Sequence, residues 1–200
     1  GRVNYGLMPY FEEFWVSDNT DAEQRLFIQW GTSMYFPAGA MAQHVSASPN
    51  HQTGRQIPLK FRFDVAMTGR LGMEMKPSDL TPKEFEFAKN AFALYKEKIR
   101  PIVQQGDQYR ILSPYEGKGY ASELYIDEAK TRGYFFAYKF RNYVNYDRPR
   151  FCFAGLDANA KYRLTEVNRD GRTDHWEGAT FSGRFLMENG IEIALNGNWA

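Results

Sequence analysis

The 200-residue chain carries 25 lysine and arginine residues against 24 aspartate and glutamate residues, which gives a net charge of +1. This balance excludes the strongly basic surface that binds nucleic acid or an acidic membrane, so we expect neither partner. With 43% hydrophobic and 24% charged residues, the composition is that of a globular protein with one large domain or two small ones.

The first predicted elements are an apolar strand and a helix, joined by a polar turn. Phe14–Val16 is apolar, and Ser17–Asp21 consists of residues that favour helix caps. Thr20 and Glu23 have the spacing of a capping box, which predicts that a helix begins here. Asp18 therefore lies where a strand gives way to a helix, and in a β/α barrel this is the face where active sites form.

The next segments alternate between strand-like and helical character, as expected of β/α units. A polar loop, Ser48–Arg55, follows a mixed apolar segment. Two interpretations fit residues 59 to 75. Leu59–Val65 alternates like a strand, but a short helix followed by a strand at Leu71–Met75 fits equally well.

The clearest helical pattern covers residues 81 to 100. Thr81 and Glu84 form a second capping box, and Pro82 occupies the first turn, where its missing N–H costs nothing. Pro101 is expected to stop the helix, because a proline disfavours helical backbone in the residue before it.

The period of the pattern changes near residues 101 to 107, and short strands take over. Turn residues such as glycine, asparagine and aspartate separate them, which predicts an antiparallel β-sandwich. The predicted strands are Tyr120–Ile126, Tyr134–Val144, Arg150–Phe153, Tyr162–Val167 and Thr180–Leu186. The change predicts two domains, residues 1–104 and 105–200.

Asp18 is the sharpest candidate for chemistry. Glycoside hydrolysis needs a carboxylic acid that stays protonated near neutral pH, and a second carboxylate across the sugar. An aromatic wall favours the protonated form by desolvating the charged one, and Phe14 and Trp15 are candidate walls. A plain helix cap fits the same position, so the residues alone leave both roles open.

Several motifs, taken together and in order, resemble the glycoside hydrolase family 36 α-galactosidases. The stretches that carry the resemblance are Gly1–Arg2, Trp15–Arg25, Ile28–Ser33, His44–Ser46, Pro49–Arg55 and Tyr109–Pro114. The resemblance implies α/β plus all-β architecture: the C-terminal portion of a (β/α)₈ TIM barrel in residues 1–104, followed by an antiparallel β-sandwich in residues 105–200. It also implies a retaining α-galactosidase that acts on terminal α-galactosides of the melibiose or raffinose type.

The resemblance assigns roles to five residues. Asp18 matches the catalytic acid/base, and Trp15 and Arg2 match positions that contact the substrate. Asp21 and Arg25 match motif positions behind the acid, where a local ion pair is the alternative role. The family's nucleophile is the aspartate of a Lys-Trp-Asp motif, which does not occur in these 200 residues. The chain is therefore expected to be a C-terminal fragment that is inactive alone.

Alternatives to this function remain. One is a non-catalytic carbohydrate-binding or structural sandwich module, and another is a relative of raffinose synthase that transfers galactose to sugars. The family resemblance also suggests a homo-oligomer. His44 and His51 could line a sugar pocket or make structural hydrogen bonds.

No metal and no cofactor are expected. Cys152 is the single cysteine, which excludes an internal disulfide and a cysteine-based zinc site, and the three histidines are too scattered for a metal site. The lone cysteine does not fix a compartment, so cytoplasmic, periplasmic and secreted locations all stay open.

Overall fold

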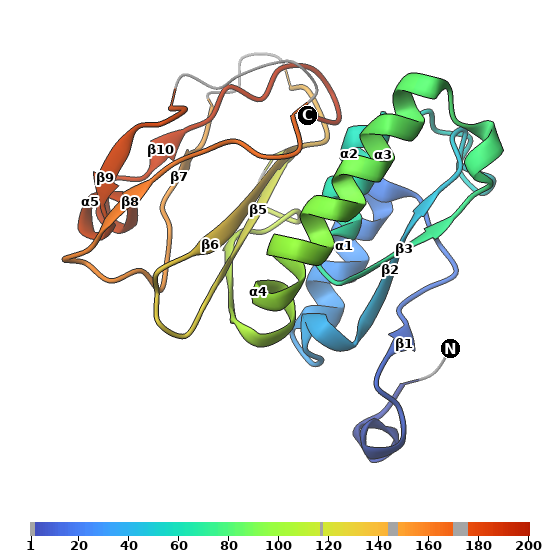
Figure 1. Ribbon diagram of the computed structural model, residues 1–200, viewed down its shortest axis with the longest axis horizontal. Helices are drawn as coiled ribbons and strands as arrows, with labels where there is room; N and C mark the ends of the chain where they lie inside the picture. Colours follow the sequence, from blue (N-terminus) through green and yellow to red (C-terminus); the bar gives the residue numbers. More distant parts are fainter. Residues whose placement is uncertain (1–2, 117, 144–147, 170–175) are drawn as a thin grey trace. The chain divides into compact units, whose positions relative to one another are not determined.

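The computed structural model describes residues 3–116, 118–143, 148–169 and 176–200 (Figure 1). The chain forms two compact units, Gly1–Gln105 and Gly106–Ala200. The first unit mixes helices with a parallel sheet, and the second is an antiparallel β region. This agrees with the predicted change of pattern after the first hundred residues.

The first unit is built from consecutive β/α units. Its sheet has the order β1-β2-β3, formed by Phe14–Trp15, Met41–Ser46 and Arg70–Glu74, and all three strands are parallel. Helix α1 (Ala22–Ser33) connects β1 to β2, and α2 (Leu59–Ala66) connects β2 to β3. Parallel neighbours joined by helices place those helices on one face of the sheet, where Figure 1 shows α1 and α2.

Helix α2 resolves the ambiguity over residues 59 to 75 in favour of a helix followed by a strand. Its side chains are buried on almost every side, including Phe61, Phe63 and Val65. A helix that is buried all round has no single apolar stripe, so its sequence lacks a clear 3.6-residue period. The same apolar residues then imitate the alternation of a strand.

The predicted cap of the first helix is wrong by one residue. Asp21 is the N-cap of α1, and its side chain accepts a hydrogen bond from the backbone N–H of Gln24 at 2.9 Å. Thr20 instead uses its hydroxyl to accept from the side chain of Asn50, at 3.3 Å. The helix therefore begins at Ala22, immediately after a buried carboxylate.

The long helical region begins as predicted and continues further than predicted. Thr81 and Glu84 form the expected capping box of α3 (Pro82–Leu94). A π-helical segment, η4 (Tyr95–Ile99), then leads into α4 (Arg100–Gln105), so Pro101 does not stop the helix. The π turn absorbs the changed hydrogen-bond register, and burial of the following side chains, Ile102 and Val103, holds the continuation in place.

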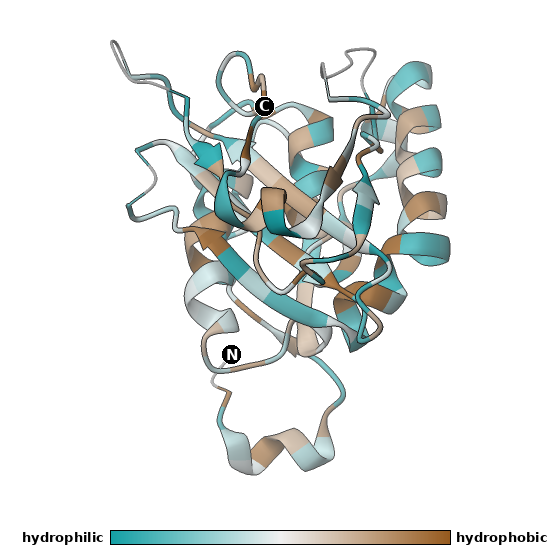
Figure 2. Cartoon of the chain, turned by 90° about the vertical axis from the view of Figure 1, so that its left-hand side faces the viewer, coloured by the Kyte–Doolittle hydropathy of each residue, from teal (hydrophilic) through white to brown (hydrophobic). Residues whose placement is uncertain are grey.

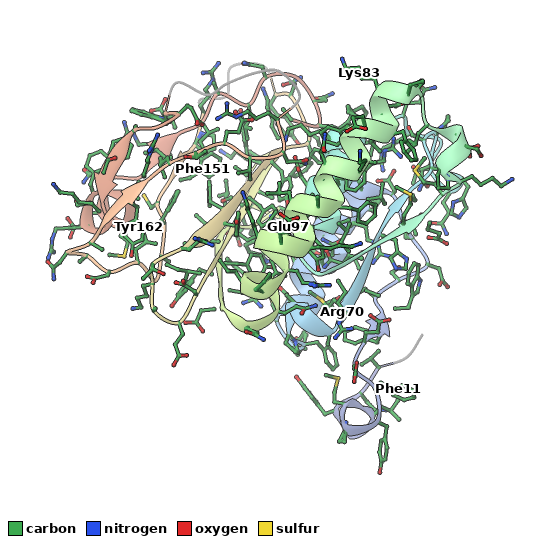
Figure 3. The ribbon with its side chains drawn as sticks, in the orientation of Figure 1. Phe11, Arg70, Lys83, Glu97, Phe151 and Tyr162 are labelled. Carbon is green, nitrogen blue, oxygen red and sulfur yellow. The ribbon has the colours of Figure 1, made fainter. Side chains whose placement is uncertain are left out.

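The described residues of the first unit also form the 3₁₀ helices η1 (Tyr5–Tyr10), η2 (Ala38–Ala40) and η3 (Pro77–Asp79). None of the residues of η1 is buried, although several are apolar, as its colouring at the bottom of Figure 2 shows. Arg70, labelled in Figure 3, ties the start of β3 to η2 by donating to the Gly39 carbonyl at 2.6 Å.

The second unit contains small antiparallel sheets. Its elements are β4 (Asp107–Leu112), β5 (Tyr120–Ile126), β6 (Gly133–Lys139), β7 (Arg150–Phe151), β8 (Lys161–Arg163), β9 (Thr180–Ser182), α5 (Gly183–Glu188) and β10 (Ile191–Glu192). Strands β4, β5 and β6 form one sheet, β7 pairs with β10, and β8 pairs with β9. Phe151, labelled in Figure 3, is 1% exposed and belongs to the apolar core of this unit.

Strand β5 has the predicted bounds, and the other predicted strands are shorter. The predicted strand Thr180–Leu186 is wrong in its second half, because Ser182 caps α5 by accepting from the Phe185 N–H at 3.1 Å. The predicted Tyr134–Val144 ends at Lys139 as β6, and Val144 lies outside the described residues.

Candidate active site

The candidate site lies at the carboxyl ends of the three parallel strands. Trp15 is the last residue of β1 and is paired with Ala42 of β2. His44 of β2 is paired with Gly72 of β3, and Ser46 is paired with Glu74. The carboxyl ends of a parallel sheet are where an open α/β sheet or a barrel places its ligands.

Alternation along β2 separates the helix side of the sheet from the site side. Gln43 is fully buried, and its side-chain carbonyl accepts from the hydroxyl of Thr68 at 3.1 Å, just after α2. His44 and Ala42 point to the opposite face because successive side chains alternate. Paired neighbours share a face, so Trp15, His44 and Glu74 lie together on the face turned away from the helices.

The Trp15 ring contacts two other side chains. The centroids of its ring and of the His44 ring lie 4.4 Å apart, with 53° between the ring planes. The guanidinium carbon of Arg25 lies 5.4 Å from the centroid of the indole, which is cation–π geometry. The residue that the sequence assigns to substrate contact is thus a packed, half-buried ring.

Arg25 is buried and only partly paired. It is 2% exposed, and its Nη2 donates to the Ser17 carbonyl at 2.9 Å. Within the described part of the chain, its Nε and Nη1 have no hydrogen-bond partner. Burial lowers the pKa of Arg25 to about 10, and the carboxylates of Glu74 and Asp18 oppose that shift. The cation therefore sits close enough to both carboxylates to feel their charge.

The local ion pair between Asp21 and Arg25 does not form. Asp21, 1% exposed, binds partners from the loop after β2. Its Oδ1 accepts from Arg55 Nη1 at 3.1 Å, and its Oδ2 accepts from the Thr53 hydroxyl at 2.5 Å. Arg55 also lies 3.7 Å from Glu23. A pairing across 34 residues replaces the pairing expected within one helical turn.

The same loop fixes the backbone before α1. The Asn50 side-chain carbonyl accepts from the backbone N–H groups of Gln52 and Thr53, which closes the loop. The Ser46 hydroxyl donates to the Thr20 carbonyl at 2.9 Å. The two motifs around Asp18 and around Asn50 therefore form one hydrogen-bonded assembly. The motifs around Asp18 and Asn50 stand out in the sequence, but the sequence did not indicate the hydrogen bonds between them.

The remaining candidate residues are more open. Asp18 is exposed in the loop after β1, so no aromatic wall encloses it among the described residues. Arg2 lies outside the described residues. His51 is exposed in the loop after β2, whereas His44 is half-buried, and its Nδ1 has no hydrogen-bond partner in the described chain. Structural hydrogen bonding therefore does not account for His44.

The described residues offer no group of three histidine, cysteine, aspartate or glutamate side chains that could hold a metal ion. Among the same residues, every helix is too short or too polar to cross a membrane. Cys152 is a free thiol and is exposed.

Comparison with known families decides the assignment. The sequence model described as Melibiase matches residues 1–106, and the one described as glycosyl hydrolase family 36 C-terminal domain matches residues 120–200. The chain belongs to glycoside hydrolase family 36. Related α-galactosidases include probable alpha-galactosidase G of Emericella nidulans, which is 40% identical over all 200 residues. Alpha-galactosidase AgaA of Geobacillus stearothermophilus is 40% identical over 164 residues, or 82% of the chain.

Solved structures of family 36 enzymes share this fold. The crystal structure of AgaA superposes with a TM-score of 0.85 at 35% identity, and the galactosidase domain of the α-galactosidase-sucrose kinase AgaSK with 0.86 at 30%. Each match covers 96% of this chain and 25% of the other. AgaA variants have been solved in complex with raffinose and with stachyose. The chain spans about a quarter of the length of its relatives, 26% for the E. nidulans protein.

Proposed function

We propose that these residues form part of the catalytic centre of a retaining α-galactosidase, with Asp18 as the general acid/base. The proposal rests on one observation above all. Asp18 follows the strand that carries Trp15, at the carboxyl edge of a parallel sheet, next to a buried cation held on the adjacent backbone carbonyl. Catalytic groups of β/α folds occupy this edge.

The proposed architecture follows from the same family. Residues 1–104 would supply the last β/α units of a (β/α)₈ barrel, and residues 105–200 a C-terminal β-sandwich. The three parallel strands in order β1-β2-β3, with connecting helices on one face, fit a segment of such a barrel. The antiparallel pairs of the second unit fit the sandwich.

The mechanism needs two carboxylates with different tasks. Asp18 protonates the departing glycosidic oxygen, and a nucleophilic carboxylate forms a covalent glycosyl-enzyme. Asp18 then takes a proton from the incoming water. In a retaining enzyme the two carboxyl groups lie roughly 5–5.5 Å apart across the sugar. We propose that the nucleophile belongs to residues beyond these 200, so that the isolated segment is inactive.

The proposed substrates are terminal α-galactosides of the melibiose and raffinose type. The AgaA complexes with raffinose and stachyose support this class. Trp15, whose ring is on the site face, and Arg2 are proposed to contact the sugar. Product analysis with an acceptor sugar separates hydrolysis from galactosyl transfer.

Asp18→Asn in the complete enzyme tests the assignment. We expect kcat/KM on raffinose to fall by about 10³-fold or more, because its leaving group needs a proton. With an activated aryl α-galactoside, the rate of formation of the glycosyl-enzyme should fall much less. Asp107→Asn, at an exposed position in β4, is the matched control and should leave both rates unchanged. Wild-type rates on both substrates in Asp18→Asn would refute the role.

A further inference from the structure

His44 occupies a position that packing and hydrogen bonding do not explain by themselves. Its ring lies against Gly72 of the neighbouring strand, so closely that a Cβ at residue 72 would overlap the imidazole. Its Nδ1 is buried and has no partner among the described residues. An apolar side chain would fill this space without leaving a polar atom unsatisfied. A buried polar atom without a partner calls for an explanation, and a role at an active site is one recognised kind.

Three successive contacts lead from the His44 ring to the residue before Asp18. His44 packs on one part of the Trp15 indole, and Arg25 places its guanidinium over the same indole. Arg25 in turn holds the carbonyl of Ser17, the residue directly before Asp18. Displacing the imidazole would release the indole, and with it the cation that fixes the backbone next to Asp18.

The backbone on the other side of Asp18 is held independently. The Asn19 N–H donates to the Ser17 hydroxyl at 3.1 Å, and the Asp21 N–H donates to the Asn19 side chain, also at 3.1 Å. Neither of these hydrogen bonds involves the indole or Arg25. What the indole and Arg25 control is the position of the Ser17 carbonyl and the distance of a buried cation from the Asp18 carboxylate.

We propose that His44 is a positioning residue for the acid/base: together with Arg25 it clamps the Trp15 indole and thereby sets the placement of Asp18 relative to the leaving group. This inference rests on the proposed role of Asp18. It predicts a loss that is larger for a substrate whose leaving group needs the proton of Asp18 than for one that does not. A weakened sugar contact of Trp15 would lower the rates on both substrates alike, so the ratio of the two rates carries the test.

The test compares two substrates on the same preparation of the complete enzyme. His44→Ala and His44→Asn both remove the aromatic ring, and we expect each to lower kcat/KM on raffinose about 10- to 100-fold. On an activated aryl α-galactoside the loss should be about tenfold smaller than on raffinose. The ratio of the two rates does not depend on the fraction of folded enzyme, so it remains informative even if a variant folds poorly.

Gln43→Ala is the matched control. Gln43 is adjacent on β2 and more deeply buried than His44, and its Nε2 also has no hydrogen-bond partner among the described residues. Its side chain points to the helix side of the sheet, where its carbonyl accepts from Thr68. This variant should lower stability and leave the ratio unchanged. Equal losses on both substrates in the His44 variants would overturn the inference. If Asp18→Asn lacks the substrate dependence as well, the proposed role of Asp18 fails and the inference falls with it. If Asp18→Asn loses more activity on raffinose than on the aryl galactoside and the His44 variants do not, the role of Asp18 stands and only the inference about His44 is refuted.

Discussion

Two neighbouring clusters in the first unit handle buried polar groups in opposite ways. The Asp21 cluster pairs its polar groups with one another, and it consists of Thr20, Asp21, Ser46, Asn50, Thr53 and Arg55. The Trp15 cluster leaves Nε and Nη1 of Arg25 and Nδ1 of His44 without partners in the described residues, and it consists of Trp15, Arg25, His44, Gly72 and Glu74. Both clusters flank Asp18.

The difference between paired and unpaired polar groups suggests different roles for the two clusters. A buried carboxylate with three donors fixes a loop to a helix, and such networks stabilise a unique local fold. A buried cation with unpaired N–H groups lowers stability, which folds tolerate mainly at functional sites. The Asp21 cluster therefore fixes the position of the loop after β2. The unpaired polar atoms of the Trp15 cluster support the proposal that this cluster belongs to the active site.

The largest expected effect is the loss of the Asp21 carboxylate. Asp21→Ala removes an N-cap, worth about 0.5–2 kcal/mol, and charged hydrogen bonds to Thr53 and Arg55, worth about 1.5–3 kcal/mol each. Arg55 is 31% exposed and can be rehydrated, so we expect a net loss of roughly 2–4 kcal/mol in the free energy of unfolding. The thermal midpoint of the complete protein measures it.

The control for Asp21 is an exposed ion pair. Glu86→Gln breaks the pair with Lys89, where both side chains are more than half exposed, and should change stability by less than about 0.5 kcal/mol. If Asp21→Ala costs no more than this control, the Asp21 cluster is not the structural anchor described above.

Gly72→Ala perturbs the Trp15 cluster from the neighbouring strand, β3. The added methyl group enters the space of the His44 ring, and overpacking of this kind costs about 1–3 kcal/mol. Gly31→Ala is the matched control, because its Cβ meets nothing within 4 Å, and a helical alanine should stabilise by about 0.5–1 kcal/mol. Opposite signs of the two midpoint shifts support the close approach; a neutral Gly72→Ala contradicts it.

The smallest expected effect is a pH dependence from His44. Burial lowers its pKa below the usual 6.5; Glu74 and Glu13 oppose the shift and Arg25 adds to it. Because the folded-state pKa is depressed, its contribution to stability is complete above about pH 6.5 and is lost as pH falls through the folded value. His44→Phe should remove this part of the pH dependence. If the thermal midpoints of the wild-type protein and of His44→Phe fall equally between pH 7 and pH 5, His44 does not contribute to the pH dependence.

Local signals in the sequence predicted local structure well. The capping box of Thr81 and Glu84 and the full extent of β5 were predicted because neighbouring residues determine them. Pro101 was misjudged because burial of later side chains outweighs its local preference. In Thr180–Leu186, the cap at Ser182 overrides strand-like composition.

The sequence suggested the residues of the proposed site but not the partners that they bind. The motif indicated Asp18, Trp15, Asp21 and Arg25 together, but the partner of Asp21 is 34 residues away and no helical spacing indicates it. The fit of His44 against Gly72 depends on the register of two strands. Such contacts are set by tertiary packing.

The most direct measurement on Asp18 is chemical rescue of Asp18→Ala in the complete enzyme by sodium azide, with an activated aryl α-galactoside as substrate. Azide needs no general base, so it should attack the glycosyl-enzyme, restore turnover and give α-galactosyl azide with retained configuration. Formation of β-galactosyl azide would identify Asp18 as the nucleophile instead, and an absence of rescue in an enzyme that still forms the glycosyl-enzyme would contradict its role as acid/base.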